Sequence, residues 1–205
     1  MENEEENNMV KEPYSHYGMY TYADYLTWDI DHMVELIKGK VFKQAAAAPR
    51  RIHQEISIKI SSQLFGLLNR KSCKVFSAPF DVRLPVKSKK HKDIRTVVQP
   101  DICVVCDPKK LDELGCVGAP DLIMEILSPS NNKKELHNKY EVYEESGVKE
   151  YWIIHPYEKT LLVYTLSGGK YISSKLFTLG DNVASGCIEG FVLDLDELFE
   201  GLDEI

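Results

Sequence analysis

Apolar residues recur every three to four positions between Arg50 and Asn69, and this spacing predicts a long amphipathic helix. A second helix is predicted from about Asn132 to Glu145, since Ser128-Pro129-Ser130 breaks the preceding run and Gly147 can end the helix. The tetrad Thr21-Tyr22-Ala23-Asp24 fits a capping box for a short helix through Trp28. Asp107-Pro108 is expected to begin another short helix.

The shorter apolar runs predict strands. Met33 to Ile37 and Val41 to Phe42 flank Lys38-Gly39-Lys40, which indicates a β-hairpin near the N-terminus. Further strands are expected at 73–84, 97–105, 150–155, 161–166 and 170–177. Leu122–Leu127 is apolar enough to be a buried central strand. This order of elements predicts an α/β fold, a mixed β-sheet flanked by helices with an N-terminal β-hairpin.

The formal net charge of −7 comes from the two ends of the chain. Residues 1–12 carry −4 and residues 194–205 carry −6, which leaves +3 for the residues between them. We expect a disordered acidic tail over 1–19, a folded domain over 20–193 and an acidic C-terminal segment over 194–205. Basic clusters that could contact phosphates are Arg50 with Arg51, and Lys87, Lys89, Lys90, Lys92 and Arg95. A solvated loop is the simpler reading of any one cluster.

The N-terminus and the cysteines bear on the cell compartment. Without an apolar run of roughly 18 residues, the sequence predicts no membrane span, and its MENEEENN start does not fit a signal peptide. The odd count of five cysteines indicates reduced thiols in a cytoplasm. Cys103 and Cys106 have CxxC spacing, but residues three apart on a strand face opposite sides. A shared zinc or redox role is therefore not expected.

Glu125 is the charged residue that most needs an explanation, because its neighbours in the run LIMEIL are all apolar. A buried carboxylate is costly unless a divalent cation or a lysine offsets its charge. Asp121 lies four residues earlier on the same strand, so about 13 Å separates the two backbones at roughly 3.3 Å per residue. Asp101 lies on a different strand and can approach Glu125. The sequence therefore favours Asp101 and Glu125 as a metal-binding carboxylate pair.

Several ordered segments resemble one family. The runs VVQPDICVV, GAPDLIMEILSPS and GVKEYWIIHP, together with Lys139 and Tyr143 on the intervening helix, resemble the Uma-two family of restriction-endonuclease-like proteins. That family belongs to the PD-(D/E)XK nuclease superfamily. VELIKGKVF and His53-Gln54 also fit, so that the resemblance spans residues 20 to 180 and implies a restriction-endonuclease-like core.

The resemblance also implies roles for individual residues. Asp101 matches the motif aspartate and Glu125 the acidic residue of the (D/E)XK strand. Leu127 stands where the motif lysine would be, and Lys139 on the next helix matches that lysine instead. Glu35 and His53 match the N-terminal acidic and His-Gln positions of the family. Two departures are Asn131 and Glu135, where Thr and Asp are commoner.

The implied reaction is metal-dependent hydrolysis of a phosphodiester. Asp101, Glu125 and a carbonyl near Ile126 would hold Mg²⁺ or Mn²⁺, which lowers the pKa of a water and neutralises charge on the phosphate. Lys139 would orient the water or stabilise the transition state. His53 would contact a phosphate or a water, or hold Glu35 in place.

Simpler interpretations exist for the same residues. Lys139 lies four residues after Glu135, the spacing of an ordinary helix ion pair, and His53 could be a surface or packing residue. Asp101 could be a strand-edge residue, and the tyrosines and Trp152 are expected to pack the sheet.

The leading hypothesis is a cytoplasmic endonuclease that acts on nucleic acid, DNA rather than RNA, and forms a homodimer. One alternative is a catalytically silent nucleic-acid-binding or scaffold protein on the same fold. Another is a hydrolase of small molecules, which would have a closed apolar pocket instead of an open groove.

Overall fold

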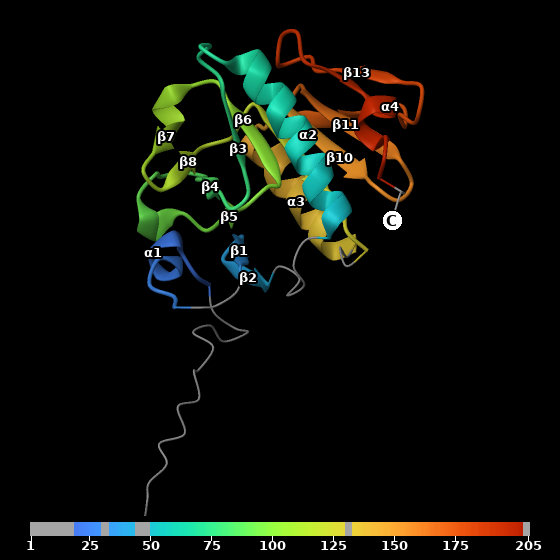
Figure 1. Cartoon of the computed structure of the whole chain (residues 1–205). Helices are drawn as coiled ribbons and strands as arrows, with labels where there is room; N and C mark the ends of the chain where they lie inside the picture. Colours follow the sequence, from blue (N-terminus) through green and yellow to red (C-terminus); the bar gives the residue numbers. More distant parts are fainter. Residues whose placement is uncertain (1–18, 30–32, 44–49, 130–132, 203–205) are drawn as a thin grey trace, which may run out of the picture.

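A mixed β-sheet with helices on both faces forms the centre of the molecule, as the sequence predicted (Figure 1). The computed structural model describes residues 19–29, 33–43, 50–129 and 133–202. Its α-helices are α1 Tyr22–Tyr25, α2 Arg51–Leu68, α3 Lys133–Ser146 and α4 Leu195–Phe199, and two 3-10 helices cover His91–Asp93 (η1) and Pro108–Lys110 (η2). In the described part of the chain, no helix is long and apolar enough to cross a membrane.

The central sheet has the strand order β12-β11-β10-β9-β6-β3. Its strands are β3 Lys74–Ser77, β6 Ile102–Val105, β9 Leu122–Ile126, β10 Glu150–His155, β11 Thr160–Ser167 and β12 Lys170–Ser173. The pair β9 and β10 is parallel, and the other neighbours are antiparallel. The parallel pair needs a crossover, which α3 supplies.

A second sheet, here called the hairpin sheet, has the order β2-β1-β5-β4-β8-β7. Its strands are β1 Val34–Ile37, β2 Lys40–Lys43, β4 Val82–Arg83, β5 Val97–Val98, β7 Leu111–Asp112 and β8 Gly115–Val117. The predicted hairpin is β1–β2, and Lys38 and Gly39 at its turn both have positive φ, which suits a two-residue turn. A small sheet of β13 Asn182–Ala184 and β14 Val192–Asp194 completes the fold.

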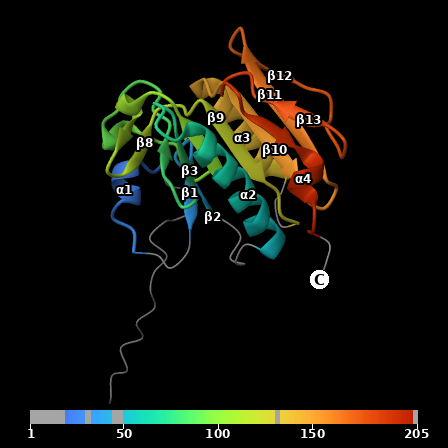
Figure 2. The same cartoon turned by 45° about the horizontal axis from the view of Figure 1, so that its top comes forward.

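Successive side chains along the central strands point to opposite faces of the sheet, which divides the core into two layers. Ile102, Val104, Met124 and Trp152 face α2 and the C-terminal segment, whereas Cys103, Val105 and Ile123 face α3 and the hairpin sheet. Figures 1 and 2 show α2 lying across one face of the central sheet. Glu125 lies two residues after Ile123 on the same strand, so its side chain points to the same face of the sheet, toward α3.

Two predicted strands are each split between the two sheets. The segment 73–84 becomes β3 and β4, and 97–105 becomes β5 and β6. Pro79 and Pro100 stand at the breaks, and a proline cannot donate to a strand ladder. The continuous strands predicted there were therefore wrong, and the break at Pro100 leaves Asp101 at the start of β6.

The remaining predicted elements differ only at their ends. The helix at Thr21 has the predicted capping box but ends at Tyr25, and β12 ends at Ser173, after which Phe177 forms a bridge with Leu161. Asp107 caps the 3-10 helix η2. The tail over 1–18, the run 45–49 and Asn131 lie outside the described residues. Leu195, Leu198 and Phe199 in the acidic C-terminal segment pack into the core, and the division of the chain into segments stays a prediction.

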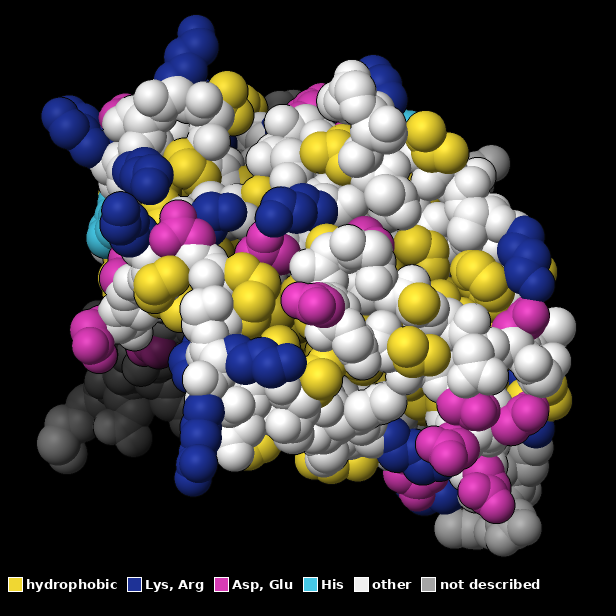
Figure 3. All heavy atoms as spheres, turned by 90° about the horizontal axis from the view of Figure 1, so that it is seen from above, with side chains coloured by type: hydrophobic (Ala, Val, Ile, Leu, Met, Phe, Trp, Pro, Cys, Tyr) yellow, Lys and Arg dark blue, Asp and Glu magenta, His cyan; other side chains and the backbone are white. Residues whose placement is uncertain are grey.

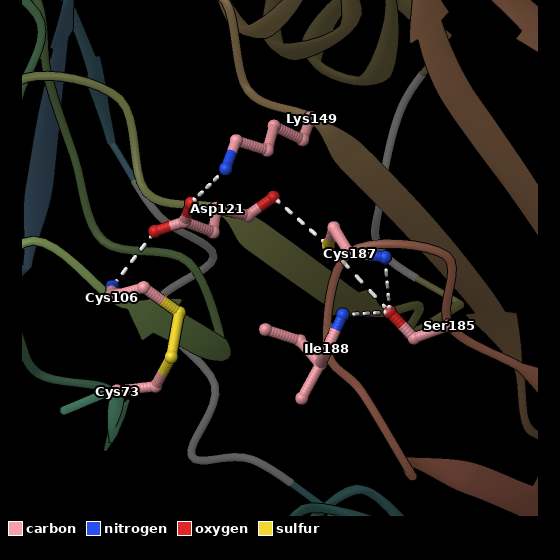
Figure 4. The surroundings of a disulfide bond; sticks show 7 residues. All are labelled: Cys73, Cys106, Asp121, Lys149, Ser185, Cys187 and Ile188. Atoms are coloured by element: carbon pink, nitrogen blue, oxygen red, sulfur yellow. Dashed lines mark hydrogen bonds and ion pairs between the residues drawn. A yellow bond between two sulfur atoms is a disulfide. The ribbon is translucent and has the colours of Figure 1, made fainter. Parts of the chain in front are cut away.

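The expectation of reduced thiols is wrong for two of the five cysteines. Cys73 and Cys106 form a disulfide that joins the ends of β3 and β6, while Cys103, Cys116 and Cys187 are free (Figure 4). β3 and β6 pair in antiparallel register, which places the two cysteines opposite each other, and sequence spacing could not show this. Cys103 and Cys106 do face opposite layers, as expected for a strand.

We expect Leu64→Ala to lower the free energy of unfolding by about 2–5 kcal/mol, because Leu64 is fully buried between α2 and the central sheet. The matched control is the next residue on the helix. Phe65 is 66% exposed, so Phe65→Ala should change stability by less than about 0.5 kcal/mol. Urea denaturation of the two variants measures both values. Equal losses would contradict the assignment of the buried face of α2.

Candidate active site

Asp101 is anchored at the point where the chain enters the central sheet. Its Oδ2 accepts a hydrogen bond from the backbone N–H of Ile126 at 2.7 Å, which ties the carboxylate to the end of β9. Its Oδ1 lies 3.1 Å from Nε2 of His53, in the first turn of α2. The carboxylate of Asp101 is 20% exposed, so it is held by both partners and still reaches the surface.

Glu125 is almost fully buried and is held by two side chains of α3. Nζ of Lys139 lies 3.0 Å from Oε1 and 3.1 Å from Oε2 of Glu125. The hydroxyl of Tyr143 donates to Oε1 at 2.8 Å. Lys139 and Tyr143 are four residues apart and therefore share one face of the helix. The helix α3 thus supplies both the positive charge and the hydroxyl that Glu125 meets inside the protein.

Glu35 brings a third carboxylate to the same lysine. Its Oε1 lies 3.1 Å from Nζ of Lys139 and accepts a hydrogen bond from the backbone N–H of Gln99 at 2.8 Å. The pairing of β1 with β5 at Leu36 sets this position. Lys38 at the hairpin turn forms ion pairs with Glu141 and Glu145 on α3, which fastens the hairpin to the helix.

When its three carboxylates are all ionised, the cluster holds more negative than positive charge among the described side chains. Among the side chains that the structure describes, Glu35, Asp101 and Glu125 face a single ammonium, that of Lys139. Burial raises the pKa of Glu125 to about 8, despite the opposing effect of Lys139. Burial would lower the pKa of Lys139, but the neighbouring carboxylates outweigh it and hold that pKa well above its usual value. A further cation would relieve the excess of negative charge.

The donor atoms fit a hard divalent cation. Mg²⁺ prefers oxygen ligands and is commonly bound by one or two carboxylates together with water. Asp101 and Glu125 supply two carboxylates, and the buried Oε1 of Gln99 and Nδ1 of His53 have no hydrogen-bond partner within the described structure. Over the same residues, no three His, Cys, Asp or Glu side chains are arranged to ligate one ion. Any such ion would therefore keep much of its water.

The five residues predicted for the site form one connected network. His53 contacts Asp101, Asp101 contacts the backbone of β9, and Lys139 joins Glu125 to Glu35. Lys139 is 4% exposed, so it is a buried residue and not part of a surface ion pair. The side chain of Glu135 lies outside the described residues. His53 pairs with Asp101 and not with Glu35, so the structure gives no support to the role of holding Glu35 in place.

Asp121 is engaged elsewhere, at the opposite end of β9. Its carboxylate accepts from the backbone N–H of Cys106 and pairs with Lys149 (Figure 4). A depression at the surface lies against α4 and is lined by Lys159, Leu179, Asp196, Glu197, Phe199, Glu200 and Gly201, none of which belongs to the network.

Sequence reasoning missed two members of the network. Gln99 bonds through its backbone to Glu35 and through its side chain to Asp81 and Tyr25. Tyr143 was matched to the family motif together with Lys139, but the role predicted for it was to pack the sheet. Its ring does lie 5.0 Å from that of Tyr151, but its hydroxyl binds Glu125. Their positions in the sequence could have indicated both residues, because Gln99 lies two residues before Asp101 and Tyr143 lies four residues after Lys139 on the same helix.

Three comparisons place the chain among known proteins. A family model described as "Uma2: Putative restriction endonuclease" matches residues 22–196. A solved structure described as a putative nuclease from Anabaena variabilis matches with a TM-score of 0.71 and 21% identity, over 89% of this chain and 99% of that one. That likeness shows a shared nuclease-like fold. An uncharacterized protein from Synechocystis sp. is 21% identical over 122 residues, 58% of this chain and 60% of that relative, so the match spans less than two thirds of its length.

We expect Glu125→Gln to be more stable than the wild type when divalent ions are removed with EDTA. Because the pKa of Glu125 is raised from 4.5 to about 8 in the folded protein, its stabilising contribution is full below 4.5 and is lost as the pH rises through about 8. Glutamine does not ionise. Thermal denaturation should show an advantage of the variant that grows across this window to a few kcal/mol, as an order of magnitude.

The matched control for this variant is Glu150→Gln. Glu150 is equally buried, but its Oε1 accepts from the backbone N–H of Gly186 and its Oε2 from Trp152 and Ser185, so an amide nitrogen at either position would face a donor and lower the melting temperature. At Glu125 the amide oxygen can keep the place of Oε1, where Tyr143 and Lys139 donate, and the ammonium of Lys139 retains Glu35 as a second partner. A Glu125→Gln variant that is less stable than wild type near pH 8 would contradict the charge assignment.

We expect Lys139→Met to destabilise the protein by about 3–5 kcal/mol, because it leaves buried carboxylates without their cation. Lys149→Met is the control. That lysine pairs with Asp121 but is 62% exposed, so its loss should cost less than about 1 kcal/mol. Chemical denaturation in EDTA compares the two, and similar losses would show that the ammonium of Lys139 does not balance the cluster.

Proposed function

The chain belongs to the Uma2 family of putative restriction endonucleases, and from this membership we propose that it hydrolyses phosphodiester bonds in nucleic acid. The reaction depends on a divalent metal ion, Mg²⁺ or Mn²⁺. The cleavage site is the network around Asp101, Glu125 and Lys139. The family description favours DNA over RNA as the substrate, and a cytoplasmic location is part of the proposal.

One observation supports this function above the others. Residues from α2, β1, β9 and α3 meet Asp101, which directly precedes β6, in a single network, and three of its members are carboxylates. Carboxylates gathered at one edge of a sheet repel one another and destabilise the folded protein. Such clusters are typical of sites that bind a cation or carry out a reaction. A silent scaffold would have no need of this excess charge. A hydrolase of small molecules would be expected to enclose its substrate, whereas Asp101 reaches the surface.

Asp101 and Glu125 would hold the metal ion. When bound, such an ion lowers the pKa of a water and neutralises charge on the phosphate. Lys139 contacts both Glu125 and Glu35, so Glu35 can keep the ammonium in place when Glu125 turns to a cation. The positive charge of Lys139 then stabilises the charge that develops on the phosphate. Tyr143 keeps the carboxylate of Glu125 oriented through its hydrogen bond.

His53 is suited to handle a proton next to the phosphate. Its Nε2 lies 3.1 Å from Oδ1 of Asp101, and in a neutral imidazole that donates through Nε2 the other nitrogen, Nδ1, is an acceptor. Nδ1 has no hydrogen-bond partner among the described residues. We therefore assign His53 to orient the attacking water or to accept its proton. A homodimer is part of the proposal for a duplex substrate, since two sites are needed to cut both strands.

Cleavage of plasmid, single-stranded DNA and RNA with Mg²⁺ or Mn²⁺ tests this function. Asp101→Asn and Glu125→Gln should each lower the rate by at least about a hundredfold, because each removes a charge that holds the ion. EDTA should abolish cleavage. The variant His53→Ala should retain part of the activity, since it keeps both carboxylates.

Glu55→Gln is the matched control on α2. Glu55 pairs with Arg51 at the surface, two residues after His53, and its loss should leave the rate unchanged. If wild type and the Asp101 and Glu125 variants cleave equally, the site assignment is wrong. If wild type binds nucleic acid but cleaves none of the three substrates with either metal, the silent binding protein is the correct alternative.

A further inference from the structure

An exposed arginine and an exposed tyrosine lie side by side next to the network. NH1 of Arg50 lies 3.3 Å from the hydroxyl of Tyr157. Arg50 is the N-cap of α2, three residues before His53. Tyr157 lies two residues after the end of β10, in the turn that leads to β11. Neither residue has a part in the proposed hydrolysis.

The chain's path places this pair at the edge where the site opens. Ile153 on β10 pairs with Glu125 on the parallel strand β9, so the two strands end at the same edge of the central sheet. His53, one turn into α2, contacts Asp101 at that edge. Figures 1 and 2 both show the start of α2 close to the end of β10. Arg50 and Tyr157 therefore flank the carboxylates on the β10 side.

The surroundings of the pair leave both groups available to a ligand. Tyr157 is 49% exposed, in contrast to the buried Tyr143 and Tyr151. Within the described residues Arg50 forms no ion pair with a carboxylate, whereas the adjacent Arg51 pairs with Glu55 and donates to the carbonyl of Leu202. The charge of Arg51 is thus used within the protein, whereas that of Arg50 meets no carboxylate in the part of the chain that the structure describes.

A phosphate needs such a charge to approach this site. The three carboxylates of the network repel a phosphodiester, and Lys139 is buried among them. A guanidinium at the rim offsets this repulsion and binds phosphate oxygens in a fixed geometry. At the other end of the molecule, basic and acidic side chains are scattered over the face, and the acidic ones are most crowded at one corner (Figure 3).

We propose that Arg50 and Tyr157 form a nucleotide-binding rim, in which the guanidinium binds a backbone phosphate and the tyrosine ring stacks on an unpaired base. This inference rests on the proposed function for the class of its ligand. The bases of a duplex are already stacked on one another, so a tyrosine beside the backbone reaches a base only where the strand is open. The strand that the rim holds is therefore single-stranded, or is a locally unpaired stretch of a duplex.

Binding measurements test the rim without reference to cleavage. Fluorescence anisotropy compares a labelled single-stranded DNA with the duplex of the same sequence, with Ca²⁺ in place of Mg²⁺ and with the probe checked by gel for integrity. Tyr157→Ala should weaken single-strand binding by about five- to a hundredfold, the range found for loss of one stacked base, and leave duplex binding within about twofold. Tyr157→Phe keeps the ring and should bind as the wild type does.

Arg50→Ala should weaken binding of both probes. It should also lower the slope of log affinity against log salt by about 0.7 on the single strand, the effect of one phosphate contact. Arg70→Ala and Phe65→Ala are the matched controls, because Arg70 follows the other end of α2 and Phe65 is an exposed ring on its outer face. Both control variants should bind as the wild type does.

The inference is overturned if Tyr157→Ala binds the single strand as tightly as wild type, or if it loses both probes equally. It is also overturned if the wild type prefers the duplex. The proposed hydrolysis fails separately. If the protein binds single strands through Tyr157 but cleaves no substrate, the rim is supported and the proposed hydrolysis is refuted. If the protein cleaves nucleic acid at a rate that Tyr157→Ala does not change, the hydrolysis is supported and the rim is refuted.

Discussion

In the described part of the chain, Lys139 is the one ammonium among three carboxylates, and the arrangement of this part of the molecule depends on it. Its Nζ lies within 3.1 Å of both Glu125 and Glu35, which come from different sheets. Without the lysine, two buried carboxylates would repel each other across the junction between the central sheet and the hairpin sheet. The ion pairs therefore join the two sheets at the point where the reactive groups are needed.

The fold is built so that these groups meet. The parallel pair β9 and β10 requires a crossover, and the crossover helix α3 carries Lys139 and Tyr143 over the face where Glu125 points. The break at Pro100 moves the chain from the hairpin sheet to the central sheet, and Asp101 follows it directly. The same break places the backbone of Gln99 against Glu35.

Stability and chemistry are in opposition at this site. Burial makes the ionised form of Glu125 costly and raises its pKa to about 8, although ionisation is what binding a metal ion requires. Tyr143 and Lys139 offset part of that cost. Such unfavourable charge is common where a protein holds a cation or stabilises a transition state, since the charge is balanced only when the ligand is present. The proposed rim of Arg50 and Tyr157 would balance charge for the substrate in a similar way, because a phosphate that the carboxylates repel needs a positive group beside them.

The sequence by itself determined the elements and the exceptional residues. Periodic apolar positions predicted α2 to within a residue or two, because a buried face must recur with the period of the helix. The Ser-Pro-Ser break and Gly147 predicted the bounds of α3 equally closely. Glu125 stood out within an apolar strand, and strand geometry excluded Asp121 as its partner. The family resemblance added Lys139, Glu35 and His53. Only the tertiary structure decided which of these groups touch, that 73–84 and 97–105 divide between two sheets, and that Cys73 meets Cys106. These contacts join residues far apart in the chain, and local periodicity carries no information about which distant strands become neighbours.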